Sequence, residues 1–255
     1  MMPATYLADL SGSRLDAAVR AAPLAILPLG SVEYHGQHGA LGTDLFLADD
    51  LARRVGGQLN ALILPAVPFS HCPPATRQYS GTINVSEETL ARYLEDVIGG
   101  VFALGLRGLL LLNAHDGNIR PARTAGDRLA ERYPEHFLLI VNWWEALPGA
   151  TLDQLGFFSQ KRGHGHGGPL EISAADAARP GTVDWQAAVN LDLITPPGGN
   201  VVQAINEGRP LPNWHGYHGR ATEGSLEKGQ QLLTVAAEQI VTLTQAWLTE
   251  LNRPF

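Results

Sequence analysis

Short apolar runs alternate with longer amphipathic stretches along the first part of the chain. The apolar runs have the length of strands and predict buried strands over 24–29, 61–69, 108–112 and 137–141. The stretches between them repeat apolar residues at helical spacing and predict helices over 45–59, 85–104 and 121–132. Residues 4–22 are expected to form a short helical lead-in. Strands that alternate with helices are typical of a parallel sheet covered by helices.

Beyond the fourth predicted strand the pattern is less regular. Pro169 stands where a helix is expected to begin, because proline suits the first helical position. Residues 180–222 are rich in proline, glycine and asparagine and predict an irregular segment. Residues 226–251 carry an apolar stripe at helical spacing and predict a long closing helix. We find no internal repeat and no shift in composition, so we expect a single domain over residues 1–255.

Polar residues that can bind metal follow the predicted strands. Glu33, His35 and Asp44 lie on a glycine-rich loop after the first strand, and His115 follows the third. Because the carboxyl ends of parallel strands meet at one edge of a sheet, these side chains are expected to gather there. Carboxylates and imidazoles together are typical metal ligands, and the mixture suits Zn²⁺, Mn²⁺ or Fe²⁺. Taken alone, the first loop can equally be a polar turn between strand and helix.

The segment 113–118, Asn-Ala-His-Asp-Gly-Asn, allows three interpretations. It can begin a helix, with Asn118 as the cap. It can bind phosphate, although it lacks the glycines and the lysine of a P-loop. It can also present His115 to a metal, which is favoured because carboxylates and an imidazole already lie on the first loop. The sequence contains no Gly-x-Ser-x-Gly motif, which disfavours hydrolysis through a covalent serine intermediate.

Composition narrows the class of protein. The chain has 255 residues, of which 45% are hydrophobic and 17% charged, as in globular proteins. A net charge of −7 and only two lysines leave no basic stripe for nucleic acid, and the longest apolar stretch is too interrupted to span a membrane. A single cysteine excludes an intrachain disulfide, and the first residues lack the pattern of a signal peptide. We therefore expect a cytoplasmic enzyme or binding protein without a nucleic-acid or membrane partner.

Several motifs, taken in order, resemble the creatininase (creatinine amidohydrolase) family. They are Leu-Pro-Leu-Gly-Ser-Val-Glu-Tyr-His-Gly-x-His at 27–38 with Thr-Asp at 43–44, Tyr-Ser-Gly-Thr at 79–82, the segment 113–118, His-Gly-Gly-Pro-Leu-Glu-Ile-Ser at 166–173, and Glu-Lys-Gly at 227–229. The resemblance implies a three-layer α/β/α fold with a mostly parallel central sheet. It also implies two divalent metal ions per chain, hydrolysis of a small-molecule amide or cyclic amide by a metal-activated water, and a homo-oligomer, often a hexamer.

The metal ligands of this family can be matched position by position. They correspond to Glu33, His35, Asp44 and His115. The resemblance implies that Asp44 bridges the two ions. In creatininase a further glutamate ligand lies two residues after the equivalent of His115, where this chain has Gly117. We infer that Glu171 contributes the missing carboxylate, as a ligand or as a base.

Proton transfer and substrate binding are also implied by the resemblance. His166 matches a histidine that transfers protons in creatininase, so we expect His166 and Glu171 to be catalytic. Four residues before His166, Arg162 replaces the tryptophan that covers creatinine in that enzyme. We therefore expect a substrate other than creatinine, with a carboxylate or phosphate that Arg162 or Arg77 binds. The residues expected to bind substrate are Arg77, Asp116, Trp144 and Arg162. Alternatives are a formamide deformylase or small-peptide hydrolase of the same family, and a non-catalytic metal-binding scaffold protein.

Overall fold

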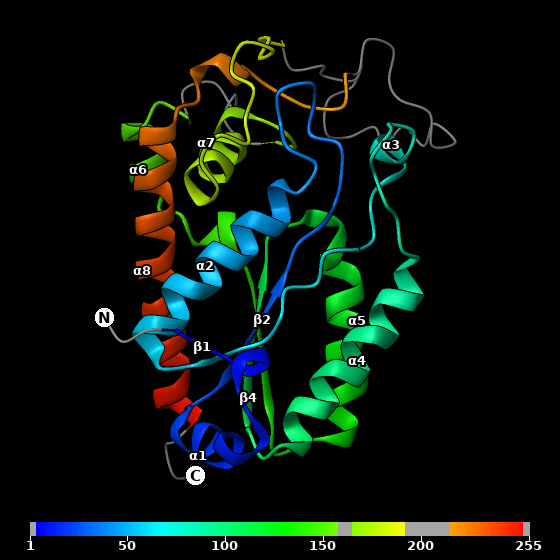
Figure 1. Ribbon diagram of the computed structural model, residues 1–255, viewed down its shortest axis with the longest axis vertical. Coiled ribbons are helices and arrows are strands. Elements are labelled where there is room, and N and C mark those ends of the chain that lie inside the picture. Colours follow the sequence, from blue (N-terminus) through cyan, green and yellow to red (C-terminus); the bar gives the residue numbers. More distant parts are fainter. Residues whose placement is uncertain (1–3, 158–164, 192–214, 252–255) are drawn as a thin grey trace.

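A parallel sheet of five strands forms the centre of the protein (Figure 1). The structure is a computed structural model that describes residues 4–157, 165–191 and 215–251. The strands are β1 (Thr5–Tyr6), β2 (Ala25–Leu29), β3 (Leu62–Ile63), β4 (Gly108–Asn113) and β5 (Phe137–Asn142). Their order is β1-β3-β2-β4-β5, and every adjacent pair is parallel. The predicted parallel sheet is confirmed.

Helices cover both faces of the sheet, as Figure 1 shows. Their bounds are α1 (Gly12–Ala21), α2 (Thr43–Leu59), α3 (Pro74–Arg77), α4 (Glu87–Ala103), α5 (Ile119–Arg132), α6 (Gly149–Gln154), α7 (Pro169–Ala178) and α8 (Leu226–Leu251). Helices α2, α7 and α8 share a hydrophobic core with Ile26 and Leu110 on one face. Helices α4 and α5 share another with Leu27 and Leu109 on the opposite face. Because side chains alternate along a strand, β2 and β4 enter both cores, and the three-layer α/β/α fold is confirmed.

Two predicted elements differ in the structure. Residues 4–22, expected to form a helical lead-in, contain the edge strand β1 and a 3₁₀ turn before α1. The strand predicted over 61–69 is reduced to β3, because Pro65 and Pro68 have no N–H group to donate to a neighbouring strand. The backbone still runs beside β2, where Val67 bridges to Leu29. The remaining predicted helices and strands differ from the observed ones mainly at their ends.

The end of β2 lies very close to the start of α2. A side chain at Gly30 would meet the Cα atom of Leu45 at 2.5 Å, so this position requires glycine. The close approach sets Asp44, in the first turn of α2, beside the loop that leaves β2. A carboxylate from a helix is thereby brought to the loop that carries Glu33 and His35.

The path of the chain across the sheet changes direction between β2 and β4. After β2 the chain adds β3 on one side, and after β4 it adds β5 on the other side, so the loops that leave these adjacent strands diverge. Parallel α/β sheets bind ligands in the crevice at such a point. Leu29 of β2 is paired with Asn113 of β4, so the two loops start at the same level. The topology therefore places a crevice between residues 30–44 and 114–118.

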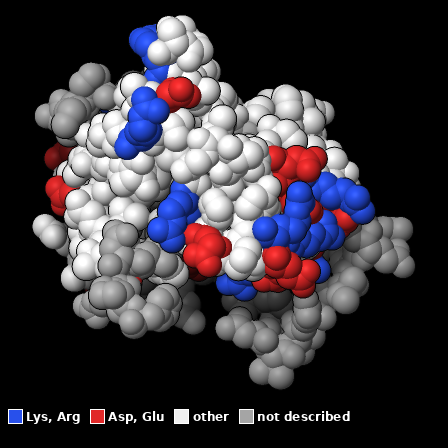
Figure 2. Space-filling model, turned by 90° about the horizontal axis from the view of Figure 1, so that it is seen from below, with Lys and Arg blue, Asp and Glu red and all other residues white. Residues whose placement is uncertain are grey.

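Charges of both signs are interspersed on the surface, and Figure 2 shows this for one face. Between α4 and α5, Arg128 lies 3.0 Å from Glu88 and Arg132 lies 2.7 Å from Glu95. Solvent screens such exposed pairs, so they contribute little to stability. Among the helices described, none has an apolar stretch long enough to cross a membrane.

Candidate metal centre

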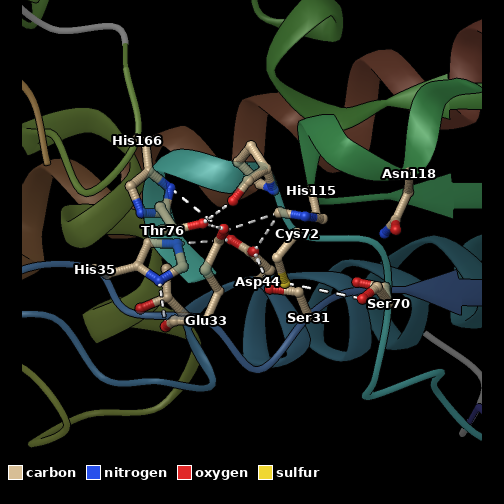
Figure 3. Close-up of polar contacts among 12 residues, drawn as sticks. Ser31, Glu33, His35, Asp44, Ser70, Cys72, Thr76, His115, Asn118 and His166 are labelled. Carbon is tan, nitrogen blue, oxygen red and sulfur yellow. Dashed lines mark hydrogen bonds and ion pairs between the residues drawn. The ribbon is translucent and has the colours of Figure 1, made fainter. Parts of the chain in front are cut away.

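Carboxylates and imidazoles from separate segments converge at the ends of β2 and β4 (Figure 3). Asp44 lies between two histidines: its Oδ1 is 3.1 Å from Nε2 of His35, and its Oδ2 is 2.9 Å from Nδ1 of His115. Oε2 of Glu33 is 3.3 Å from the same nitrogen of His115. All of these side chains are at most 5% exposed. The structure thus brings together the ligands expected from the sequence.

Backbone carbonyl groups fix the orientation of both imidazole rings. Nδ1 of His35 is 2.9 Å from the Glu33 carbonyl oxygen, and Nε2 of His115 is 2.9 Å from that of His71. Because a carbonyl oxygen only accepts hydrogen bonds, these two nitrogens carry protons and donate them. The other nitrogen of each ring faces the carboxylates. Metal-binding histidines in proteins are usually held in this way.

His166 borders the same cluster from the loop before α7. Its Nε2 donates to the Tyr34 carbonyl at 2.6 Å, which leaves Nδ1 as an acceptor, 3.5 Å from Oε2 of Glu33. Its ring lies 4.2 Å from that of His35, centroid to centroid. Burial, and then the charge of His35, lower the pKa of His166 well below its usual range. His166 is therefore a neutral imidazole whose free nitrogen faces the cluster.

Glu171 contributes a carboxylate on the side of the cluster formed by His35. Its Oε2 accepts a hydrogen bond from the Gly167 N–H at 2.7 Å and lies 3.6 Å from Nε2 of His35. At Gly117, by contrast, a side chain would meet the His71 carbonyl oxygen at 2.0 Å. A glutamate at position 117 therefore does not fit unless that carbonyl moves. This supports the inference that Glu171 supplies the carboxylate that is missing at Gly117.

Two buried hydroxyl groups hold the carboxylates. Ser31 Oγ donates to Oδ2 of Asp44 at 2.7 Å, and the Thr76 hydroxyl donates to Oε1 of Glu33. Oε2 of Glu33 is buried and accepts no hydrogen bond from the residues that the structure describes. Burying such an oxygen is costly unless a partner satisfies it. Neither hydroxyl was expected from the sequence. Ser31 lies within the motif at 27–38 and could have been found there, whereas no motif contains Thr76.

Neighbouring charges shift the pKa values of these groups. Burial lowers the pKa of His35, but the charges of Asp44 and Glu171 outweigh it and raise this pKa to about 10. Burial raises the pKa of Asp44, but the charge of His35 outweighs it and holds this pKa well below its usual range. Burial raises the pKa of Glu33, and it raises that of Glu171 to about 8. Crowded, buried carboxylates that take up protons in this way suit a cation.

The donors divide into two sets that share Asp44. His35, Asp44 and Glu171 present ligand atoms within 4.8 Å of one another. Nδ1 of His115 lies 2.9 Å from the other oxygen of Asp44 and 3.3 Å from Oε2 of Glu33. Each set mixes carboxylate oxygen with imidazole nitrogen, which suits Zn²⁺ and Mn²⁺. The residues therefore fit a pair of divalent cations with Asp44 between them.

A cavity of about 470 Å³ opens onto the cluster. Glu33, His115 and Glu171 of the cluster line its polar side. Trp143, Trp144 and Leu170 line its apolar side. His218, which sequence reasoning did not select, also lines the cavity. The combination of an apolar wall and a few polar groups is typical of a small-molecule site.

The residues expected to bind substrate have different positions. Asp116 and Trp144 line the cavity. Arg77 is not among the lining residues described; its Nε donates to the Cys72 carbonyl at 2.6 Å instead. Arg162 lies outside the described residues. The described wall therefore offers a carboxylate and aromatic rings, with no arginine or lysine.

Comparison with known proteins matches the chain to one family. The family model of creatininase, described as creatinine amidohydrolase, matches residues 8–244. The creatinine amidohydrolase of Pseudomonas putida is 25% identical over 260 residues, 94% of this chain and 96% of that protein. The 3-dehydro-scyllo-inosose hydrolase of Thermotoga maritima is 27% identical over 143 residues, 56% of this chain and 46% of that protein. The mycofactocin precursor peptide peptidase of Mycobacterium tuberculosis is 34% identical over 107 residues, 38% of this chain and 42% of that protein.

Solved structures of creatininase share the fold. A crystal structure of creatinine amidohydrolase has a TM-score of 0.84 at 24% identity, over 98% of this chain and 99% of that chain. A mutant creatininase of Zn–Zn type has a TM-score of 0.82 at 24% identity, over 95% of this chain and 98% of that chain. Creatininase with Mn has a TM-score of 0.82 at 24% identity, over 96% of this chain and 99% of that chain. The last two structures therefore contain Zn or Mn on the same fold.

Proposed function

Because the chain belongs to the creatininase family, we propose that it is a metal-dependent amidohydrolase that cleaves a non-peptide or cyclic amide C–N bond. The observation that carries the proposal is the position of Asp44 between His35 and His115, each of which turns its second ring nitrogen toward this carboxylate. The unsatisfied buried oxygen of Glu33 supports a cation at the same place. Relatives named as amidohydrolase, hydrolase and peptidase support hydrolysis as the class of reaction.

The chain offers ligands for two cations, which we propose to be Zn²⁺, Mn²⁺ or Fe²⁺. His35, Glu171 and Oδ1 of Asp44 would hold one, and Glu33, His115 and Oδ2 of Asp44 the other. Bound there, divalent cations would polarise a substrate carbonyl. They would also lower the pKa of a bound water molecule, so that this water can act as a nucleophile at neutral pH. Ser31 keeps Asp44 in position through its hydrogen bond at 2.7 Å.

His166 moves the proton in this proposal. Its Nε2–H is held by the Tyr34 carbonyl, so Nδ1 is the nitrogen that takes a proton from the attacking water. Its lowered pKa keeps the ring neutral, so Nδ1 carries no proton before the reaction. The same nitrogen then delivers the proton to the amide nitrogen, which leaves as an amine. The C–N bond breaks as a carbonyl C–O bond forms, and no electrons are exchanged with a cofactor.

We propose an amide other than creatinine as the substrate. Arg162 stands where the family resemblance places the tryptophan that covers creatinine. Creatinine, which is flat and neutral, would therefore lose that contact. Trp143 and Trp144 give the described cavity a wall for an apolar or planar substrate body. A panel that contains creatinine, lactams, formamides and short peptides decides among substrates. Turnover of creatinine on the order of 10 per second or more, typical of a dedicated enzyme, would contradict this assignment.

The variant Asp44→Ala tests the cation pair. The purified protein is expected to hold close to two transition-metal ions per chain, and Asp44→Ala to lose both because each cation loses a ligand. The exposed Asp153 gives a control, since Asp153→Ala removes a carboxylate that is not part of the cluster and should leave metal content unchanged. Elemental analysis measures both. A parent protein with no bound or restorable metal would refute the proposed function, and full metal content in Asp44→Ala would refute the shared ligand.

A further inference from the structure

Cys72 is a buried thiol beside the half of the cluster formed by Glu33 and His115 (Figure 3). It is the single cysteine of the sequence, and its side chain has no solvent exposure. It stands in the loop between β3 and α3. Its Sγ, a carboxylate oxygen of Glu33 and a ring nitrogen of His115 all lie within 4.8 Å of one another. Three donor atoms from three segments therefore surround one small volume.

The surroundings of the thiol favour a cation in that volume. Oε2 of Glu33 is fully buried and accepts no hydrogen bond from the described residues. Nδ1 of His115 faces this oxygen at 3.3 Å, while the carbonyl of another residue holds its Nε2. The thiol is held by long contacts, 3.8 Å to the Ser70 carbonyl and 3.9 Å to the Ile83 carbonyl. Coordination of a cation would satisfy the carboxylate oxygen and would replace these long contacts of the sulfur.

We propose that Cys72 binds, as a thiolate, the cation that Glu33 and His115 hold. The proposal rests on the proposed function, because it concerns one of the two cations of that site. On binding, the S–H bond breaks, the proton leaves to solvent, and the sulfur donates an electron pair to the cation, so nothing is oxidised or reduced. The ligands implied by the family resemblance include no sulfur.

A thiolate makes the two cation positions chemically different. Sulfur ligands favour Zn²⁺ over Mn²⁺, whereas carboxylate and imidazole ligands accept both. The position formed by Cys72, Glu33 and His115 is therefore the zinc-selective one. The position formed by His35, Glu171 and Asp44 also accepts Mn²⁺. A mixed centre with one zinc and one manganese ion is expected when both metals are supplied.

Titration with Co²⁺ tests the proposal on the full chain. Metal-free protein is titrated while ligand-field absorption reports cobalt bound to any ligand, and sulfur-to-cobalt charge-transfer absorption reports a Co–S bond. We expect the charge-transfer band to saturate at one Co²⁺ per chain and to be absent from Cys72→Ser. No other cysteine can produce it. The variant Ser70→Ala, which changes a neighbouring buried hydroxyl, is expected to keep the band.

Metal affinities give a second measurement. Loss of a direct ligand should cost at least as much as loss of an outer partner, so Cys72→Ser is expected to lower the affinity for the tighter Zn²⁺ by about 100-fold or more. The affinity for Mn²⁺ at the other position should fall much less. Equal losses for both metals would mean that Cys72 acts on the whole site through packing, and would overturn the proposal.

The outcomes separate this proposal from the proposed function. Stoichiometric cobalt binding without a charge-transfer band would overturn the role of Cys72 and leave the metal site standing. Absence of any cobalt binding would overturn both. If Cys72→Ser does not fold, zinc-edge X-ray absorption of the parent protein decides: a sulfur shell at about 2.3 Å supports the proposal, and oxygen and nitrogen alone at about 2.0–2.2 Å refute it.

Discussion

The hydrogen bond from Ser31 to Asp44 tests how the chain holds the carboxylate that we propose to bridge two cations. Ser31 Oγ donates to Oδ2 of Asp44 at 2.7 Å, and both side chains are at most 1% exposed. The variant Ser31→Ala removes this hydroxyl and changes little else, because alanine keeps the Cβ atom. We expect it to fold, to bind both cations more weakly, and to keep the same number of binding positions.

The expected magnitude follows from the charge of the acceptor. A hydrogen bond to an ionised group contributes about 1.5–3 kcal/mol, which equals roughly a 10- to 100-fold change in affinity. Loss of an outer partner of a metal ligand typically costs the same 10- to 100-fold. In Ser31→Ala the carboxylate still meets His35 and His115. Its orientation is therefore only partly lost, and we expect a loss near the lower limit, about tenfold.

Competition with a chromophoric chelator measures this affinity for Zn²⁺ and Mn²⁺ separately. Ser70→Ala is the matched control: Ser70 is also fully buried, but its Oγ has no hydrogen-bond partner among the described residues. Its loss should leave both affinities at the parent value. If Ser31→Ala binds both cations as tightly as the parent does, the hydroxyl does not orient Asp44 and the reasoning fails.

Three further predictions follow from packing, linkage and proton transfer. Gly229→Ala places a Cβ atom 1.8 Å from the Ser173 carbonyl oxygen and should lower the free energy of unfolding by about 1–3 kcal/mol. Gly100 has open space around it, so Gly100→Ala should raise the free energy of unfolding by about 0.5–1 kcal/mol. Urea titration measures both variants, and similar effects from the two would contradict this packing argument. Chelation should lower the Tm, and Zn²⁺ at 100 times its Kd should restore about 2.7 kcal/mol; an unchanged Tm would mean that no metal stabilises the fold. His166→Ala should keep its metal and lower turnover by about 10²–10⁴, whereas lost metal would make His166 a ligand.

Two of the strands that were predicted well, β2 and β4, are buried on both faces. β2 is apolar throughout, β4 is apolar up to Asn113, and both are buried at every position, so an unbroken apolar run marks them in the sequence. β1 has only two residues, Thr5 and Tyr6, and a segment this short leaves no periodicity to detect. β3 was predicted too long because an apolar run was treated as a strand, although Pro65 and Pro68 limit its hydrogen bonding.

In the candidate site, the sequence marks the ligands but not what orients them. Glu33, His35 and Asp44 are close in sequence and lie in a recognisable motif. The groups that lock His35 and His115 are backbone carbonyls, which every residue has, so no residue type signals them. Arg77 shows the converse: an arginine near a motif predicted a substrate contact, whereas in the structure its guanidinium donates to the backbone carbonyl of Cys72, just before helix α3. Only the folded chain distinguishes these cases.

The source of the carboxylate beside His35 couples the site to the hydrophobic core. Glu171 comes from the first turn of α7, not from the loop after β4, where the His71 carbonyl leaves no space for a side chain at Gly117. Helix α7 is packed against α8 so closely that Gly229 has no room for a Cβ atom. The position of Glu171 therefore depends on a contact between two helices of the core. A change that separates α7 from α8 should weaken the cation held by His35 and Glu171 more than the cation held by Glu33 and His115, because only the first takes a ligand from α7.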